Sequence, residues 1–233
     1  MILVHWNRLK EEQIPFTGIE LVKQDSFFSE TDTSFSISGI QSGDFVLVFR
    51  TSDSGSATWS SVFQGGTSIL PNDALNSGVG PDSVLGYYVA TSSLLIVETT
   101  AGGGEDQEAY EMVSYAVFRN VNSTTPIDVT PTYVADSAGN IAPNPPSITT
   151  VTDGCMIIVL VSIDDSDITS ATFDSSYTLL TKLHGGTGDP CHYLIYKTQS
   201  TAGTENPAQF TNYPTSIPSN DDHHTVTLAL RPA

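Results

Sequence analysis

Residues 150–165 read Thr-Val-Thr-Asp-Gly-Cys-Met-Ile-Ile-Val-Leu-Val-Ser-Ile-Asp-Asp. The Asp153-Gly154 pair is a turn signal, and every residue from Cys155 to Val161 is apolar. A short apolar run that follows a turn and is rich in β-branched residues is typical of a buried strand rather than of a helix. We therefore expect this strand to lie in the middle of a sheet and to be covered on both faces.

The same pattern occurs once before in the chain. Residues 37–49 (Ile-Ser-Gly-Ile-Gln-Ser-Gly-Asp-Phe-Val-Leu-Val-Phe) align without a gap with residues 148–160, at an offset of 111. Further matching segments follow in the same order, and one of them places Tyr88 on Tyr196. Because the offset stays nearly constant, we infer an internal duplication in which loop insertions and deletions shift the spacing slightly.

The turn signals divide the first copy into short strands. We expect strands at 17–25, 33–39, 44–51, 57–63, 83–90, 93–99 and 110–119. No stretch shows a helical period with caps at its ends. The pattern predicts an all-β fold of two tandem antiparallel β-sandwich domains, with jelly-roll and immunoglobulin-like topologies both open. The predicted divisions are an N-terminal arm at 1–13, a first domain at 14–127 and a second domain at 128–233.

Composition limits the classes of partner. The chain has 233 residues, of which 8 are Lys or Arg and 26 are Asp or Glu, for a formal net charge of −18. This charge disfavours nucleic acid and anionic membrane surfaces, so neither is expected as a partner. No apolar run reaches the ~18 residues of a membrane span, and the apolar start at 2–4 is too short for a secretory signal. Cys155 and Cys191 are expected to be free, buried thiols.

The sequence predicts no catalytic, cofactor-binding or metal-binding residue, and no enzyme activity. His184-Gly-Gly looks like an oxyanion loop, but the Gly-x-Ser-x-Gly elbow that such a loop serves does not occur, so we interpret it as a glycine turn. Metal sites at 221–224 or at Asp164, Asp165 and Asp167 are weaker alternatives. A sugar-stacking platform is another, although core packing is preferred for its aromatic residues, which are Trp6, Trp59, Tyr87, Tyr88, Tyr193, Tyr196 and Tyr213.

Residues 1–13 precede the first copy and have no counterpart before the second. They mix apolar and charged side chains, and exposed aliphatic and tryptophan side chains prefer a partner. Two interpretations are equally supported: a strand that packs on the chain's own first domain, and an arm that docks on a neighbouring subunit. The candidate assembly residues are Ile2, Leu3, Val4, Trp6 and Leu9.

Three stretches of the second copy carry a resemblance to known proteins. They are 143–159 (Pro-Asn-Pro-Pro-Ser-Ile-Thr-Thr-Val-Thr-Asp-Gly-Cys-Met-Ile-Ile-Val), 196–207 (Tyr-Lys-Thr-Gln-Ser-Thr-Ala-Gly-Thr-Glu-Asn-Pro) and 226–233 (Val-Thr-Leu-Ala-Leu-Arg-Pro-Ala). The first copy matches less fully, in its Ser-Gly-Asp and Tyr-Tyr-Val-Ala strands and in 115–128. Together they resemble a repeat module in structural proteins of marine tailed phages, cyanophages among them.

The resemblance implies a non-enzymatic virion structural protein that acts by protein–protein assembly in a capsid decoration, neck, tail or proximal fibre. Its partners would be other virion proteins and further copies of itself in a homo-oligomer. The protein would be assembled in the host cytoplasm and would reside in the virion. A second class stays open at this point, a carbohydrate-binding adhesin that contacts a glycan on the host surface.

Overall fold

The computed structural model describes residues 18–29, 34–52, 63–70, 75, 81–98, 111–136, 142–163, 171–185, 190–212 and 222–233. Within these ranges the chain is all-β, which confirms the predicted fold class, and all pairing between its strands is antiparallel. No helix there is long and apolar enough to cross a membrane.

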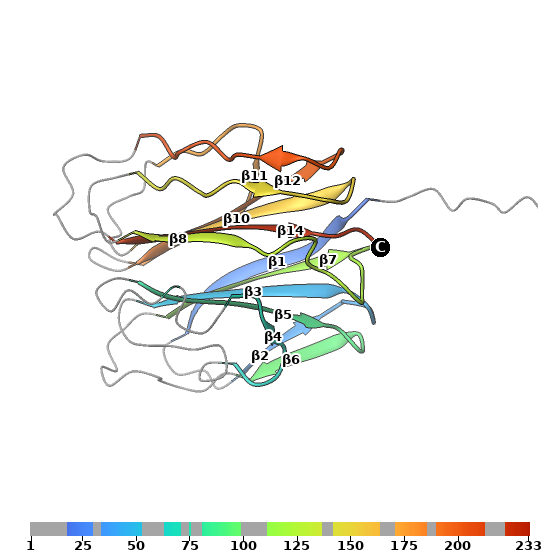
Figure 1. Ribbon diagram of the computed structural model, residues 1–233. Helices are drawn as coiled ribbons and strands as arrows, with labels where there is room; N and C mark the ends of the chain where they lie inside the picture. Colours follow the sequence, from blue (N-terminus) through green and yellow to red (C-terminus); the bar gives the residue numbers. More distant parts are fainter. Residues whose placement is uncertain are drawn as a thin grey trace, which may run out of the picture.

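The first group of strands forms a five-stranded sheet and a two-stranded sheet (Figure 1). The larger sheet has the order β1-β7-β3-β5-β4, with bounds β1 Glu20–Ser29, β7 Glu111–Arg119, β3 Phe45–Ser52, β5 Asp82–Val89 and β4 Thr67–Ser68. The smaller sheet pairs β2 (Ser34–Ser38) with β6 (Leu94–Glu98). The predicted strand at 57–63 lies almost wholly outside the described residues, and β4 was not predicted.

The second group repeats this arrangement. Its larger sheet has the order β8-β14-β10-β12-β11, with bounds β8 Thr132–Asp136, β14 His223–Leu230, β10 Cys155–Ile163, β12 Cys191–Gln199 and β11 Thr178–His184. Its smaller sheet pairs β9 (Ile148–Thr149) with β13 (Thr204–Glu205). Each strand occupies the place of its counterpart in the first group, which is what an internal duplication would produce. The division at residue 127 stays a prediction.

The structure corrects the alignment of one strand pair by one residue. Leu47 on β3 lies opposite Tyr87, and its counterpart Ile158 on β10 lies opposite Tyr196. Tyr196 is therefore equivalent to Tyr87, and the placement on Tyr88 was wrong. A shift of one residue moves a strand side chain to the other face of the sheet. Two consecutive tyrosines left the sequence with no means to choose between the faces.

The two five-stranded sheets pack face to face and share one hydrophobic core (Figure 1). This inner core joins Phe45, Leu47, Phe49, Ala116 and Phe118 of the first group to Met156, Ile158, Leu160, Leu194 and Leu228 of the second. The alternate residues of β3 and β10 face outward into two further clusters, which include the small sheets. Both central strands are buried at every residue, as predicted, because each lies between two cores.

Each half holds a buried aspartate–arginine pair, but the two aspartates come from different places. Arg119 donates to both carboxylate oxygens of Asp44, at 2.9 Å each. The counterpart of Asp44 at the offset of 111 is Cys155, so Arg231 has no such partner on β10. Arg231 instead donates from Nε to Asp128, 3.0 Å away, in the segment that joins the halves. The second half thus depends on a residue that precedes its first strand.

The backbone at Gly66 lies very close to β5. A Cβ added there would be 2.8 Å from the carbonyl oxygen of Tyr87, and the φ angle of Gly66 is +69°. Gly39 has a similar φ of +76° but nothing within 4 Å of an added Cβ. Both substitutions to alanine incur a left-handed backbone cost of about 1–2 kcal/mol. We expect Gly66→Ala to be the more destabilising by about 1 kcal/mol or more in urea unfolding; equal losses would contradict the close approach.

Candidate functional site

The structure describes only some of the residues that the sequence singled out. The arm residues Ile2, Leu3, Val4, Trp6 and Leu9 lie outside the described residues, as do Asp164, Asp165, Asp167 and Asp221. Tyr88 and Tyr193 are buried, and Tyr87 and Tyr196 pack against the inner core, so the core interpretation is confirmed for these four. Trp6, Trp59 and Tyr213 are outside the described residues.

In the described part of 221–224 the two histidines do not converge. His224 shares a sheet face with the inner-core residue Val226, and His223 points to the opposite face because neighbouring strand residues alternate. No cluster of three or more metal-capable side chains occurs among the described residues. His184 ends β11, and the rest of the predicted glycine turn, beyond Gly185, lies outside the described residues.

A polar layer lies at one end of the inner core, where the sheets approach through hydroxyl and imidazole groups. We define it by its members, which are Thr51, Ser83, Ser114, Ser162, His192 and His224. The Ser83 and Ser162 hydroxyls are 2.7 Å apart, and the Ser114 hydroxyl is 2.5 Å from Nε2 of His192. Both bonds join one sheet to the other, so this layer fixes how the sheets align.

The Ser114–His192 contact has the composition of a nucleophile and its base, but its burial gives it a structural role. Both side chains are fully buried. Burial also lowers the pKa of His192 to about 3, so the imidazole is a poor proton acceptor for catalysis at neutral pH. A substrate would have to enter between two packed sheets to reach the pair. The contact is therefore best described as a hydrogen bond within the core.

The cysteines are free and buried, as predicted. Burial, followed by the nearby negative charge of Asp128, raises the pKa of the Cys155 thiol to about 12. A thiol with so high a pKa carries almost no thiolate at neutral pH. Cys155 is therefore a packing residue and not a nucleophile.

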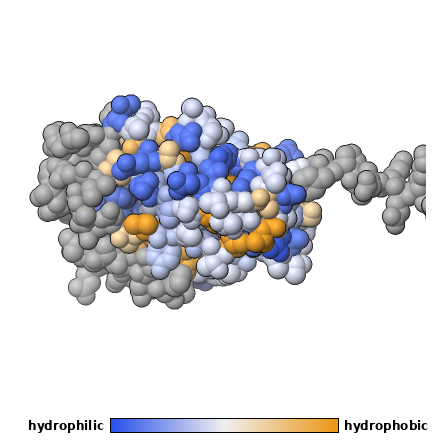
Figure 2. Space-filling model, turned by 45° about the horizontal axis from the view of Figure 1, so that its top comes forward, coloured by the Kyte–Doolittle hydropathy of each residue, from blue (hydrophilic) through white to orange (hydrophobic). Residues whose placement is uncertain are grey.

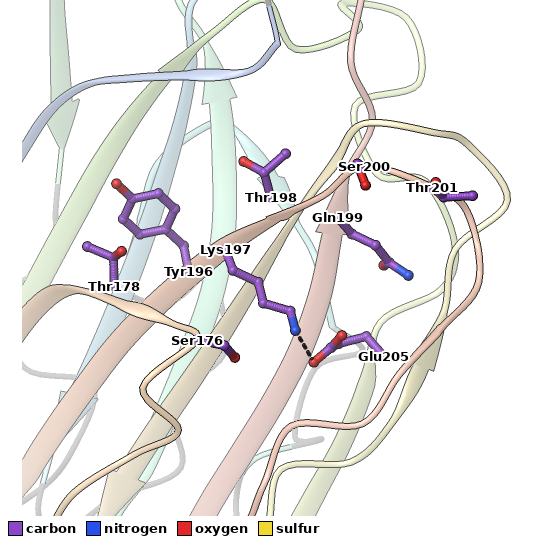
Figure 3. Close-up of a pocket in the computed structure, with 9 residues that line it drawn as sticks. All are labelled: Ser176, Thr178, Tyr196, Lys197, Thr198, Gln199, Ser200, Thr201 and Glu205. Atoms are coloured by element: carbon purple, nitrogen blue, oxygen red, sulfur yellow. Dashed lines mark ion pairs between the residues drawn. The ribbon is translucent and has the colours of Figure 1, made fainter.

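A shallow polar groove of about 550 Å³ lies where β12 extends beyond the start of β11 (Figure 3). The residues that line it all have polar or charged side chains; they are Ser176, Thr178, Tyr196, Lys197, Thr198, Gln199, Ser200, Thr201 and Glu205. Figure 3 shows Lys197 and Glu205 reaching toward each other, with Tyr196 on the other side of the strand. Sequence reasoning missed the groove, because Lys197 lies on β12 and Glu205 on β13, and these residues meet only in the folded structure.

The charges within the groove neutralise each other. Lys197 Nζ lies 2.6 Å from Glu205 Oε1 and 4.9 Å from the centre of the Tyr177 ring. The Tyr177 hydroxyl donates to the same carboxylate at 3.0 Å, and burial, followed by the charge of Glu205, raises the pKa of that phenol. The phenol therefore remains a donor at all physiological pH values. Such a surface, neutral overall and rich in hydroxyl groups, suits a neutral polar ligand.

In the described ranges, exposed apolar side chains are scattered, and β8 is the one strand that exposes them on both faces. The face in Figure 2 is mostly hydrophilic or intermediate, with separate hydrophobic areas. The large exposed apolar residues among those described are Phe28, Leu94, Ile96, Tyr133, Val134, Val151 and Leu179. On β6, Leu94 and Ile96 occupy one face while the other face is packed. On β8, Tyr133 is 43% exposed and its neighbour Val134 is 38% exposed, on opposite faces.

β8 also lies at the edge of its five-stranded sheet, paired on one side with β14. The edge strand β1 has an irregular register near Leu21 and carries Lys23, and β11 has an irregular register near Leu179 and carries Lys182. Bulges and lysines of this kind discourage pairing with another chain. β8 has neither, and its pairing with β14 is regular along its whole length.

The two candidate sites are thus an open strand edge and a neutral polar groove, both on the second group of strands. Comparison with protein-family models, with curated proteins and with solved structures found no match for this chain.

Proposed function

We propose that this protein is a non-enzymatic structural subunit of a tailed-phage particle and that it acts by protein–protein assembly. The observation that carries the proposal is the edge strand β8, which offers apolar side chains on both faces, pairs regularly with β14 and has no charged side chain before its last residue, Asp136. Edge strands of this kind pair with extended segments of other chains. The resemblance of 143–159, 196–207 and 226–233 to phage structural modules supports the same function.

The fold suits a subunit that must hold its shape. The two halves share one core and are joined by hydrogen bonds within the polar layer, so they move together as one block. The reactive groups described above are buried or engaged in packing, and they support no catalytic step. A rigid block with one adhesive edge is the form expected of an assembly component.

Particles purified from cells infected by the phage that encodes this chain provide the test. We expect mass spectrometry of gradient-purified particles to find the protein in a fixed ratio to the other virion proteins. Electron microscopy with an antibody against the chain would then locate it. Particles that lack the protein, while infected-cell lysate contains it, would overturn the proposal.

The polar groove favours a second function, a carbohydrate-binding adhesin. Hydroxyl and amide groups beside a neutralised charge pair match the hydrogen-bonding groups of a sugar. We expect Glu205→Gln to abolish binding to any glycan that the wild-type protein recognises on an array, because it removes the charge that positions Lys197. Glu98→Gln, at an exposed site on β6, is the control and should leave binding unchanged. An array with no wild-type signal would remove this function.

A further inference from the structure

We propose that β8 is a strand-addition site and that its occupant is the segment at residues 2–9 of a second copy of this chain. The inference rests on the proposed assembly function, to which it adds the partner and the contact. Residues 2–9 lie outside the described residues, so the argument starts from what β8 requires and from the chemistry of that segment.

β8 requires a partner strand that is apolar on both faces. Tyr133 points toward the side of the inner core and Val134 toward the opposite side, and both are exposed. An added strand would lie beside them in the plane of the sheet and would cover both faces at once. A strand with one polar face would leave either Tyr133 or Val134 uncovered.

The segment at residues 2–6 has this character. It reads Ile-Leu-Val-His-Trp, so in an extended conformation Ile2, Val4 and Trp6 share one face and Leu3 lies on the other. β-Branched and aromatic residues are favoured in strands. The segment can therefore cover both sides of β8 while its backbone pairs with the open edge.

Charge favours the same pairing between copies. Two copies of a chain with a net charge of −18 repel each other. The first ten residues carry two of the eight cationic side chains, Arg8 and Lys10, and none of the 26 carboxylates. Residues 2–9 themselves carry Arg8 and no carboxylate, so this segment is attracted to the acidic body of another copy. β8 itself contributes no charge before Asp136, so the contact brings no like charges together.

The segment is also joined to the body by enough chain to reach a neighbour. Residues 10–18 separate it from Ile19, the first buried residue of the described part. Nine extended residues span about 30 Å, which exceeds the distance across a five-stranded sheet at ~5 Å per strand spacing. A head-to-tail contact between a segment and an edge generates rings or filaments, depending on its geometry.

Two full-length variants test the two sides of the contact separately. Val134→Lys places a charge on the edge, and Val4→Asp places one in the segment. We expect each to raise the dissociation constant of self-association about tenfold or more, measured by light scattering over a dilution series. Val151→Lys is the matched control, because Val151 is 67% exposed outside any strand, and it should associate like the wild type. An unchanged thermal unfolding midpoint for each variant would show that the fold is intact.

Mixing the two defective variants provides the decisive observation. The Val4→Asp protein keeps an intact β8 and the Val134→Lys protein keeps an intact segment, so an equimolar mixture should recover one contact and associate. Three results would overturn the proposal. The first is a monomeric wild type, as would be found if the segment bound within its own molecule. The second is loss of association in Val134→Lys alone, which would indicate that β8 pairs with β8, and the third is no recovery of association on mixing. None of these bears on whether the protein is found in particles, so the proposed function is tested independently.

Discussion

Replacing Asp128 with alanine is expected to lower the free energy of unfolding by about 2–4 kcal/mol, because it removes a buried carboxylate from a partly exposed arginine and from a backbone N–H. The Asp128 side chain is fully buried. It accepts hydrogen bonds from Arg231 Nε at 3.0 Å and from the backbone N–H of Val151 at 2.7 Å. Alanine would leave both donors without their acceptor inside the protein. The midpoint and slope of urea unfolding measure the loss.

Asp25→Ala is the matched control for this prediction. Asp25 is exposed on β1, and its replacement removes the same single negative charge from the acidic chain. We expect its effect to stay within about 0.5 kcal/mol of zero. Asp128→Asn should lie between the two, since it keeps one acceptor oxygen. If Asp128→Ala were no more destabilising than Asp25→Ala, the ion pair would not hold the second half in place.

Mild acid is expected to unfold the protein, because the polar layer buries two histidines in their neutral form. Burial lowers the pKa of His192 from 6.5 to about 3, and burial, followed by the charge of His223, lowers the pKa of His224 to about 4. Below pH 6.5 the unfolded chain therefore binds protons that the native protein does not. Each histidine then removes about 1.4 kcal/mol of stability per pH unit. At pH 4.5 the two together would remove about 5 kcal/mol, which is the whole stability of many domains.

Other titrating groups act in the opposite direction or at a lower pH. Acidification toward the isoelectric point of about 4.2 reduces self-repulsion, which by itself would stabilise the fold. Burial opposes ionisation of Asp128, but hydrogen bonds from Thr152, Val151 and Arg231 outweigh it and lower its pKa, so its contribution is lost only below about pH 4. Urea unfolding at several pH values in high salt, where surface charges are screened, isolates the histidines. Stability that is flat from pH 7 to 5 would contradict the prediction.

A single substitution tests whether the polar layer causes this dependence of stability on pH. His224→Gln removes one titrating group, so the slope of unfolding free energy against pH between 6.5 and 4.5 should fall by about half. The variant itself will be less stable at neutral pH, but the slope is independent of that offset. Gln24→Ala, at an exposed site on β1, removes no titrating group; it is the control and should keep the wild-type slope.

Much of the fold could be predicted from the sequence because the central strands have a clear sequence pattern. β10 and β3 are bounded by a glycine turn and are apolar throughout, which is how a strand between two cores must look. β11 was not predicted, since its irregular register near Leu179 breaks the alternation of buried and exposed residues. The packing of the two halves on each other was not predicted either. An apolar face has the same appearance whether its own domain or a neighbouring one covers it.

Less of the candidate sites could be predicted. The polar groove depends on Lys197 and Glu205, which belong to different strands and meet through the fold. In the sequence, Tyr133 and Val134 of β8 read equally well as core residues. Whether a strand lies at an edge is decided by pairing between distant segments, and one sequence contains no record of that pairing.

The shared inner core has a consequence for how such modules are inherited. A single copy would expose the broad apolar face of its five-stranded sheet, which in the described part of this chain packs against the other copy. It would also be cut off from Asp128 if recombination separated the second copy at that point. Longer chains assembled from this module should therefore gain and lose copies in pairs. The linker within each pair, which carries the aspartate, should be kept, and the linkers between pairs should vary more.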